Sequence, residues 1–582
     1  MSQDRWPVRD AASKSYGIYS RANVGEIFPD PITPLNASAG FQAHLEAGWR
    51  DAFVNCGVWD HSLYEGEPDR VIIPAFGSYL YINMSLMRLF GIRVPGFSVE
   101  AVDLQYFGDM PGIPSYESEQ RPGDENEDFA AQAGAWLVGN VMGTADLAVH
   151  DADRTMVEQI QASRPDLSTL TDEELRARLV SFGAPLQRMF ANHIEASLKC
   201  GVGLGAVAQI AAAVGMPELS LTLVQGIGDV DSTGPSTALW NLSRRAAASP
   251  GVAALFDSGI DGLLGRVEAS EDPVVVAFGA DVADFLAEWG FRGPGEWEIS
   301  VDTWGTRPEL ALAIVDKLRR VADDQNPEAK QLRLAAERET AQDRVRGALA
   351  GNDEVLAQFE GALHAAALWL RGRERQRTTG AMLMHELRLP ALEWGKRLVE
   401  RGALDDARQL FMLFADELDT FAADPASMID ELRSRHETYL DLARYEPPFV
   451  TVGAAPNYTE WPLRGSDEVE IAAAGDTIQG IGGCVGVARG RARVVLSPHE
   501  DVQFEPGEIL VAPITDPSWT PLFMTAAAVI VEVGAPFSHA AIVSRELGIP
   551  CVVSASDVTR SIPTGALIEV DGTSGTVRII EV

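Results

Sequence analysis

The segment from Ala526 to Val553, AAAVIVEVGAPFSHAAIVSRELGIPCVV, places one histidine where it could do chemistry. An apolar run of strand length (528–533) leads through a Gly-Ala-Pro break to His539, and residues 540–547 then have the apolar spacing of a helix. A helix start offers unpaired backbone N–H groups and the positive end of the helix dipole, and both attract an anion. A neutral imidazole placed there is suited to accept a phosphoryl group as a nucleophile. For a lone histidine a capping or core role is more common than a nucleophilic one, so the choice between them depends on the surrounding sequence.

That string resembles the phosphohistidine, or swivelling, domain of phosphoenolpyruvate-utilising enzymes. The family pattern is approximately GGxxSHAAIVARExGIPAVV, and the present sequence reads GAPFSHAAIVSRELGIPCVV, with Ala535 in place of the second glycine. The match continues in TDPSWTPLF (Thr515–Phe523) and VDGTSGTV (Val570–Val577), so it covers essentially all of residues 479–582. Members of this family include phosphoenolpyruvate synthase, pyruvate phosphate dikinase, rifampicin phosphotransferase and phenylphosphate synthase.

The resemblance implies that His539 is a phosphocarrier, which takes phosphate from an ATP-derived donor while its domain swings to deliver it elsewhere. Ser538, Thr515 and Arg545 lie in the matching motifs and are expected to support the loop around the phosphorylated ring. Ala535 is expected to stiffen the loop before His539 and to leave the nucleophile intact.

A second candidate group is Arg373-Glu374-Arg375-Gln376-Arg377, inside a predicted helix. Arg373 and Arg377 are four residues apart and therefore share a helix face. A solvated basic stripe is the common result of such spacing, and two guanidinium groups that fork onto a transferring phosphoryl group are the alternative. The pattern resembles the acceptor-side Arg-Glu-x-x-Lys/Arg of rifampicin phosphotransferase. This resemblance implies that the group faces the phosphohistidine and that Glu374 accepts the proton of the acceptor hydroxyl.

The resemblance extends upstream in weaker form. ANVGEIFPDPITPL (22–35) and FGSYLYINMS (76–85) look like the opening of the acceptor-binding region of rifampicin phosphotransferase. WGFRGPGEWEISVDTWGTRPE (289–309) looks like its GHRGPxE segment, with Phe291 in place of the usual histidine. Arg292 and Glu296 are then expected to bind the acceptor, and Phe291 puts an acid/base role at that position in doubt. If Gly293–Gly295 is only a turn, Arg292 and Glu296 are expected to form a surface pair.

The rest of the chain predicts a multi-domain α + α/β protein. Residues 1–445 form a mostly helical acceptor-binding region, with a mixed α/β part at 15–110 and a helical part at 130–445. Antiparallel helices are predicted at 307–350, 353–377, 380–402 and 405–444, a capping box at Thr171–Glu174, and helix breaks or starts at Asn326-Pro327 and Asp424-Pro425. Residues 446–478 are rich in Pro, Gly and polar residues and are predicted to be a linker. Residues 479–582 are predicted to be a small β/β/α swivelling domain.

Composition narrows the function classes. The chain has 582 residues, with 47 basic and 84 acidic ones and a net charge of −37, which disfavours nucleic acid and membrane partners. Five of the basic residues are Lys, so a phosphate-handling site is expected to use Arg.

The four widely spaced cysteines indicate free thiols in a reducing cytoplasm and no zinc site. The apolar window 201–215, GVGLGAVAQIAAAVG, is predicted to be a buried helix rather than a membrane span or nucleotide loop.

These features lead to one hypothesis and two alternatives. The hypothesis is the acceptor-binding and phosphohistidine subunit of a dikinase-type phosphotransferase, whose acceptor is a small organic hydroxyl compound such as a phenol or an alcohol. Since no Walker A pattern or carboxylate metal site is evident, ATP and Mg²⁺ are expected to be bound by a separate ATP-grasp subunit, as in phenylphosphate synthase. One alternative is a non-catalytic regulatory module that reports phosphorylation of the histidine. The other is an enzyme that uses His539 as an acid/base without nucleotide.

Overall fold

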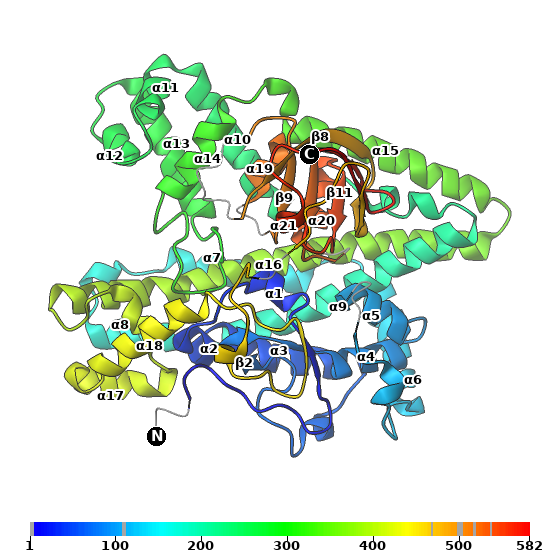
Figure 1. Cartoon of the computed structure of the whole chain (residues 1–582), viewed down its shortest axis with the longest axis horizontal. Coiled ribbons are helices and arrows are strands. Elements are labelled where there is room, and N and C mark those ends of the chain that lie inside the picture. The colour runs from blue at the N-terminus through cyan, green and yellow to red at the C-terminus, as the bar shows by residue number, and fades with distance from the viewer. Residues whose placement is uncertain (1–4, 108–111, 467–468, 497–503, 516–518, 536–537) are drawn as a thin grey trace. The chain divides into compact units, whose positions relative to one another are not determined.

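The protein is described by a computed structural model that covers residues 5–107, 112–466, 469–496, 504–515, 519–535 and 538–582 (Figure 1). The chain divides into two compact units that take alternating stretches of sequence. Unit 1 comprises residues 1–202, 297–300 and 368–468, and unit 2 comprises residues 203–296, 301–367 and 469–582. Two long helices, α9 (Gly183–Ala213) and α16 (Asp353–Glu400), contribute residues to both units.

Unit 1 is mostly helical. Besides parts of α9 and α16, its helices are α1 (Val24–Ile27), α2 (Pro34–Ala39), α3 (Phe41–Asn55), α4 (Met84–Arg93), α5 (Val99–Phe107), α6 (Glu127–Trp136), α7 (Ala148–Ala162), α8 (Asp172–Val180), α17 (Leu418–Ala423) and α18 (Ile429–Leu442). The predicted capping box is present at the start of α8, where the Thr171 and Glu174 side chains each bond to the other's backbone N–H. The break predicted at Asp424-Pro425 is also present, because α17 ends at Ala423.

The mixed part of unit 1 contains short strands. β1 (Ile18–Ser20) lies between β4 (Ile82–Asn83) and β5 (Val450–Val452) in an antiparallel sheet, and β2 (Ala75–Phe76) pairs with β3 (Tyr79–Leu80). β5 lies inside the stretch predicted as a linker, because its backbone completes the sheet on the free edge of β1. The domain boundaries proposed from the sequence stay a prediction.

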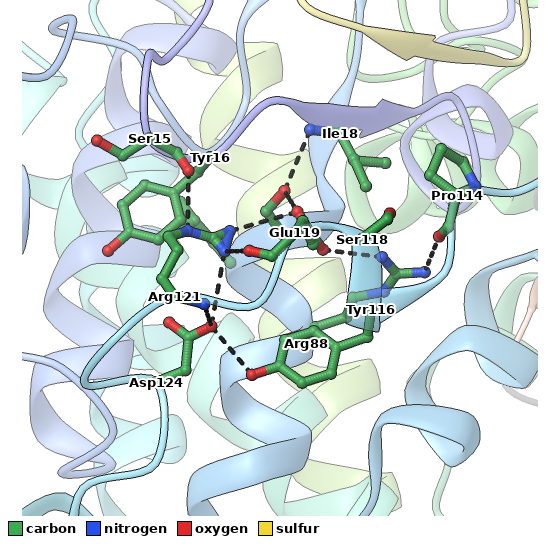
Figure 2. Close-up of polar contacts among 12 residues, drawn as sticks. Ser15, Tyr16, Ile18, Arg88, Pro114, Tyr116, Ser118, Glu119, Arg121 and Asp124 are labelled. Atoms are coloured by element: carbon green, nitrogen blue, oxygen red, sulfur yellow. Dashed lines mark hydrogen bonds and ion pairs between the residues drawn. The ribbon is translucent and has the colours of Figure 1, made fainter.

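An ion-pair network fixes the loop after α5 in unit 1 (Figure 2). The guanidinium of Arg88, on α4, pairs with Glu119 at 2.8 Å and with Asp103 at 2.7 Å. Glu119 also pairs with Arg121 at 3.3 Å, and the Tyr116 hydroxyl donates to Asp124 at 3.0 Å. Because Arg88 is fully buried, these carboxylates supply the charge compensation that a buried guanidinium requires.

The helix break predicted between residues 377 and 380 is wrong, because α16 is one continuous helix from Asp353 to Glu400. Gly380 has a packing role instead. A Cβ atom added there would lie 2.7 Å from the Met189 sulfur and 2.8 Å from the Trp297 ring. The glycine therefore lets α9 and the Trp297 side chain approach α16 closely, and it does not end the helix.

Unit 2 begins with helices. They are α10 (Gly234–Ala248), α11 (Pro250–Asp257), α12 (Leu263–Glu268), α13 (Pro273–Trp289), α14 (Glu309–Leu318) and α15 (Pro327–Ala348). α15 begins as predicted, with Asn326 as its N-cap and Pro327 in its first turn. The apolar window 201–215 lies mostly in α9, where Gly203 packs against the backbone of Ala366 on α16. One helical stretch of the described chain, Asp172–Ala213, is long and apolar enough to cross a bilayer, but a core helix has the same properties, and 44% of its apolar window is buried.

The C-terminal part of unit 2 is built on an eight-stranded sheet (orange to red in Figure 1). Its strands are β6 (Thr477–Gln479), β7 (Ile481–Cys484), β8 (Val487–Val494), β9 (Ile509–Ala512), β10 (Ala528–Val531), β11 (Cys551–Val553), β12 (Leu567–Asp571) and β13 (Thr576–Glu581), in the spatial order β6-β13-β12-β8-β9-β10-β11-β7. Strands β8 to β11 are parallel and the outer pairs are antiparallel. Three helices, α19 (Thr520–Thr525), α20 (His539–Leu547) and α21 (Val558–Ser561), complete this region.

Candidate active site

His539 is the first residue of α20, as the sequence predicts. The buried Ala-Val-Ile-Val run forms β10, and the chain then turns into α20. Ser538 caps the helix, because its hydroxyl accepts the backbone N–H of Ala541 at 3.4 Å. Gly548 ends the helix in the left-handed conformation at φ 66°. The imidazole therefore lies beside the unpaired N–H groups of the first helical turn, where an added phosphoryl charge would be stabilised.

The neighbours of the His539 ring favour one tautomer for nucleophilic attack. The Thr515 hydroxyl oxygen lies 3.3 Å from Nδ1, and the Phe523 ring packs edge-on at a centroid distance of 5.9 Å. If Nδ1 donates its proton to this oxygen, Nε2 keeps the lone pair that a nucleophile needs. Ser538, Thr515 and His539 are brought together as predicted, and His539 is only 3% exposed.

The loop before His539 is tightly packed around Gly534. A Cβ atom there would lie 3.1 Å from Val553 and 3.2 Å from the Ser538 hydroxyl. Ala535 takes part in the turn, since its carbonyl accepts the backbone N–H of Ser538 at 2.9 Å. Residues 516–518 and 536–537 of the matching motifs lie outside the described residues.

Arg545 lies on a different face of α20 from His539, because six residues of helix rotate the side chain by about 240°. Its guanidinium is buried, and its charge lowers the pKa of both Cys484 and Cys551, against the stronger effect of burial, which raises each to about 12. The structure thus places Arg545 near the two thiols, and its part in supporting the phosphohistidine loop stays a prediction.

In unit 1, α16 buries Glu374 and Arg377 and leaves Arg373 half-buried, so these residues do not form a solvated stripe. Arg373 and Glu374 form an ion pair. Arg375 points elsewhere, to Asp151. A guanidinium group that is withdrawn from water needs a nearby negative charge, and Glu374 supplies one for Arg373.

Three further residues interact electrostatically with Arg373 or Arg377. The sequence analysis did not identify them. Glu26 on α1 is half-buried; burial raises its pKa to about 7, and Arg373 and Arg377 oppose that rise. Burial, helped by the same two arginines, lowers the pKa of His193 on α9 to about 3, so its ring is neutral. Burial raises the pKa of Tyr106 to about 12, again opposed by Arg373. No local signal could have found them, because they come from three helices far apart in sequence.

The packing of α9 on α16 orients the arginine face. Asp153, fully buried on α7, accepts hydrogen bonds from Gln376 at 2.7 Å and from Asn192 at 2.5 Å, and pairs with Arg188 at 2.8 Å. The neighbour of Asn192, His193, hydrogen-bonds to the backbone of Arg373. These contacts fix the register of the two helices and hold His193 against the arginine that the resemblance singles out.

Arg292 and Glu296, in unit 2, form a buried ion pair at 2.8 Å, with both side chains 1% exposed. The expectation of a surface pair is therefore wrong, although Gly293–Gly295 do form a turn. The turn folds inward because the Arg292 carbonyl accepts the backbone N–H of Trp304 at 2.8 Å. Phe291 packs against Trp289 and is 2% exposed. Its phenyl ring has no proton to transfer, so the site has no acid/base group at this position.

Among the described residues, no group of three or more His, Cys, Asp or Glu side chains is arranged to hold a metal ion.

Two family models match the sequence. Residues 193–374 match the fourth domain of rifampicin phosphotransferase, and residues 504–575 match the mobile domain of the PEP-utilising enzymes. The second match contains His539 and four strands of the eight-stranded sheet, β9 to β12. The first contains Arg292, Glu296, Arg373 and Glu374.

Similar curated proteins include phosphotransferases. An uncharacterised protein of Mycobacterium tuberculosis is 36% identical over 50% of this chain and 30% of its own length. The prodigiosin synthesizing transferase PigC of Serratia marcescens is 24% identical over 98% of this chain and 64% of its own length. The rifampicin phosphotransferase of Bacillus subtilis is 28% identical over 51% of this chain and 34% of its own length. The chain thus spans between 30% and 64% of the length of these relatives.

Proposed function

Because this chain carries the mobile domain of the PEP-utilising enzymes and is related to rifampicin phosphotransferases, we propose that it is the phosphohistidine and acceptor-binding part of a dikinase-type phosphotransferase. The acceptor is a small organic molecule with a hydroxyl group, such as a phenol or an alcohol. One observation carries the proposal: His539 begins α20, with Nδ1 beside the Thr515 hydroxyl.

In the first half-reaction, Nε2 of His539 attacks a phosphorus atom of an ATP-derived donor. The N–P bond forms as the P–O bond to the leaving group breaks, and Nδ1 keeps its proton through Thr515. The N–H groups at the start of α20 stabilise the phosphoryl charge. We propose that a separate ATP-grasp subunit binds ATP with Mg²⁺ and that the protein acts in the cytoplasm.

In the second half-reaction, the acceptor oxygen attacks the phosphoryl group and the N–P bond breaks. Arg373 and Arg377 neutralise charge on the transferring group, since planar guanidinium groups match phosphate geometry. Glu374 or Glu26 takes the hydroxyl proton, and the pKa of Glu26 near 7 suits a general base at neutral pH. Arg292 and Glu296 complete the proposed acceptor region.

His539 is buried in the structure, and we propose that movement of the domain that carries it helps to open the ring to a donor. Such movement agrees with a carrier that alternates between two partners. It also agrees with the mobile-domain match.

The test uses the full chain with ATP, Mg²⁺ and an ATP-grasp subunit. We expect an acid-labile phosphate on His539, detected by mass spectrometry, and its loss in His539→Ala. The matched control is His61→Ala, which removes an exposed histidine and is expected to keep the label. Absence of the label contradicts the proposal. Label without transfer to any phenol or alcohol points to the regulatory module, and activity without nucleotide points to acid/base chemistry by His539.

A further inference from the structure

Glu546, near the C-terminal end of α20, is bound by a loop of the helical part of unit 2. Its carboxylate accepts the backbone N–H of Ile227 at 3.1 Å and of Gly228 at 3.3 Å, and the Gln331 side chain hydrogen-bonds to it as well. The Glu546 side chain is 1% exposed. The C-terminal end of α20 is therefore hydrogen-bonded, through the buried Glu546 carboxylate, to a segment more than 300 residues away in the sequence.

The loop is shaped to receive an anion. Gly226, Gly228 and Asp229 have positive φ angles of 54°, 71° and 54°, and alternation of such residues turns successive N–H groups toward one side. Arg338 holds the opposite side, since its guanidinium donates to the carbonyls of Gln225 and Gly226. The N–H groups that meet Glu546 are thus fixed before the carboxylate arrives.

A second contact lies two residues further along the chain. Gly548 packs on Leu334 so closely that an added Cβ atom would lie 2.9 Å from a Leu334 methyl carbon. Gln331, Leu334 and Arg338 have the i, i+3, i+7 spacing of one helix face, and α15 runs alongside the C-terminal sheet region in Figure 1. We call loop 225–229 together with these three side chains the docking face.

The chemistry of the docking face suits a contact that forms and breaks. Burial raises the pKa of Glu546, while the two amides and the charge of Arg338 oppose that rise. On release, both the carboxylate and the amides regain water, so the net free energy of the contact is small compared with its gross strength. A mainly apolar interface of the same size would hold the domain more permanently.

We propose that the docking face is the resting position of the mobile domain, that Glu546 is the residue that positions the domain there, and that His539 becomes reachable only after Glu546 leaves loop 225–229. The inference rests on the proposed function in one respect, namely that His539 carries the phosphoryl group. His539 and Glu546 are ends of one rigid helix, so release at Glu546 displaces His539 as well. Glu546 is a positioning residue and takes no part in the chemistry.

The first experiment compares Glu546→Ala with Glu581→Ala in the full chain. Glu581 is an exposed glutamate on β13 of the same sheet and serves as the matched control. Hydrogen exchange of the peptide containing residues 225–229 is expected to rise on the order of tenfold in Glu546→Ala and to stay unchanged in the control. Unchanged exchange in Glu546→Ala overturns the proposal.

The second experiment measures the rate of chemical phosphorylation of His539. A purely local structural role of Glu546 would leave this rate unchanged. Phosphoramidate transfers its phosphoryl group to accessible imidazole and needs neither ATP nor a partner. The Glu546→Ala variant is expected to label His539 several-fold faster than the wild type, as measured by mass spectrometry. Equal labelling rates overturn the proposal.

A disulfide between Leu334→Cys and Gly548→Cys is the complementary test, because the backbone of Gly548 packs directly against the Leu334 side chain. The stapled protein is expected to label about tenfold more slowly than its reduced form, with Gly548→Cys alone as the control for strain at positive φ. An equal labelling rate in the disulfide-bonded and reduced forms contradicts the docked state. A failure of the two cysteines to cross-link contradicts it as well. If ATP with a partner subunit fails to label His539, the proposed function fails, yet exchange and cross-linking still report on the docking face.

Discussion

The Thr515 hydroxyl oxygen lies 3.3 Å from Nδ1 of His539, and we propose that a hydrogen bond between them sets the tautomer of the ring. Thr515→Val keeps the shape of the side chain and removes the hydroxyl. We expect His539 to be phosphorylated three- to tenfold more slowly, because one neutral hydrogen bond that orients the tautomer is lost. Rapid-quench phosphorylation assays measure the rate. Thr515→Ser should restore it, and a Thr515→Val rate equal to the wild type would contradict the tautomer assignment.

The arginine face of α16 should separate the two half-reactions. Arg377→Ala is expected to reduce transfer to the acceptor by about 100-fold and to leave phosphorylation of His539 unchanged, since we propose that the guanidinium acts on the group transferred to the acceptor. Single-turnover transfer from phosphorylated protein measures the effect. Arg375→Ala is the matched control, because Arg375 pairs with Asp151 instead. A parallel loss in both half-reactions would place Arg377 in the fold rather than in the transfer step.

Glu26 should make the stability of the protein depend on pH. Its pKa rises from 4.5 to about 7 on folding, so the native state holds a proton that the unfolded state has lost between these values. The contribution of Glu26 to stability is therefore full below pH 4.5 and declines as the pH rises toward 7. Glu26→Gln is expected to stabilise the protein at pH 8 by at most about 3 kcal/mol and to change little at pH 4.5. Urea unfolding at the two pH values checks this, and an equal effect at both would exclude the shift.

Two glycines of α9 should respond in opposite directions to the same change. A Cβ atom at Gly203 would meet the backbone N of Ala366 at 2.6 Å, whereas nothing lies within 4 Å of one at Gly205. Gly203→Ala is expected to destabilise by about 1–3 kcal/mol, because α9 and α16 must move apart. Gly205→Ala is expected to stabilise by up to about 1 kcal/mol through helix propensity. Thermal unfolding distinguishes them, and changes of the same sign would refute the packing explanation.

The sequence predicted the segment around His539 well because its signals are local. The apolar run of β10, the Ser538 cap and the left-handed Gly548 each act within a few residues, and all three are present in the structure. The same local reasoning failed at Gly380, which pattern alone treats as a helix break. Its neighbours Met189 and Trp297 are distant in sequence, so the packing reason for the glycine was invisible.

The candidate site was only partly predictable for the same reason. Arg373 and Arg377 could be placed on one face from their spacing, but their burial and their interaction with Glu26 and His193 depend on tertiary packing. Likewise, the charges of Arg292 and Glu296 favoured an exposed location for both side chains. In the structure they form a buried ion pair, next to a turn whose Arg292 carbonyl accepts the backbone N–H of Trp304. Charge and periodicity report the preferences of single elements, and a site made by several elements needs their assembly.

The pairing of β1 with β5 has a consequence for synthesis on the ribosome. Strand 18–20 finds its partner 450–452 only after roughly 430 further residues have been made, so this sheet closes late and with a high entropic cost of loop closure. Until then the edge of β1 facing β5 is exposed to wrong partners. We therefore expect fragments that stop before residue 450 to aggregate when expressed, even where every catalytic residue they contain is intact.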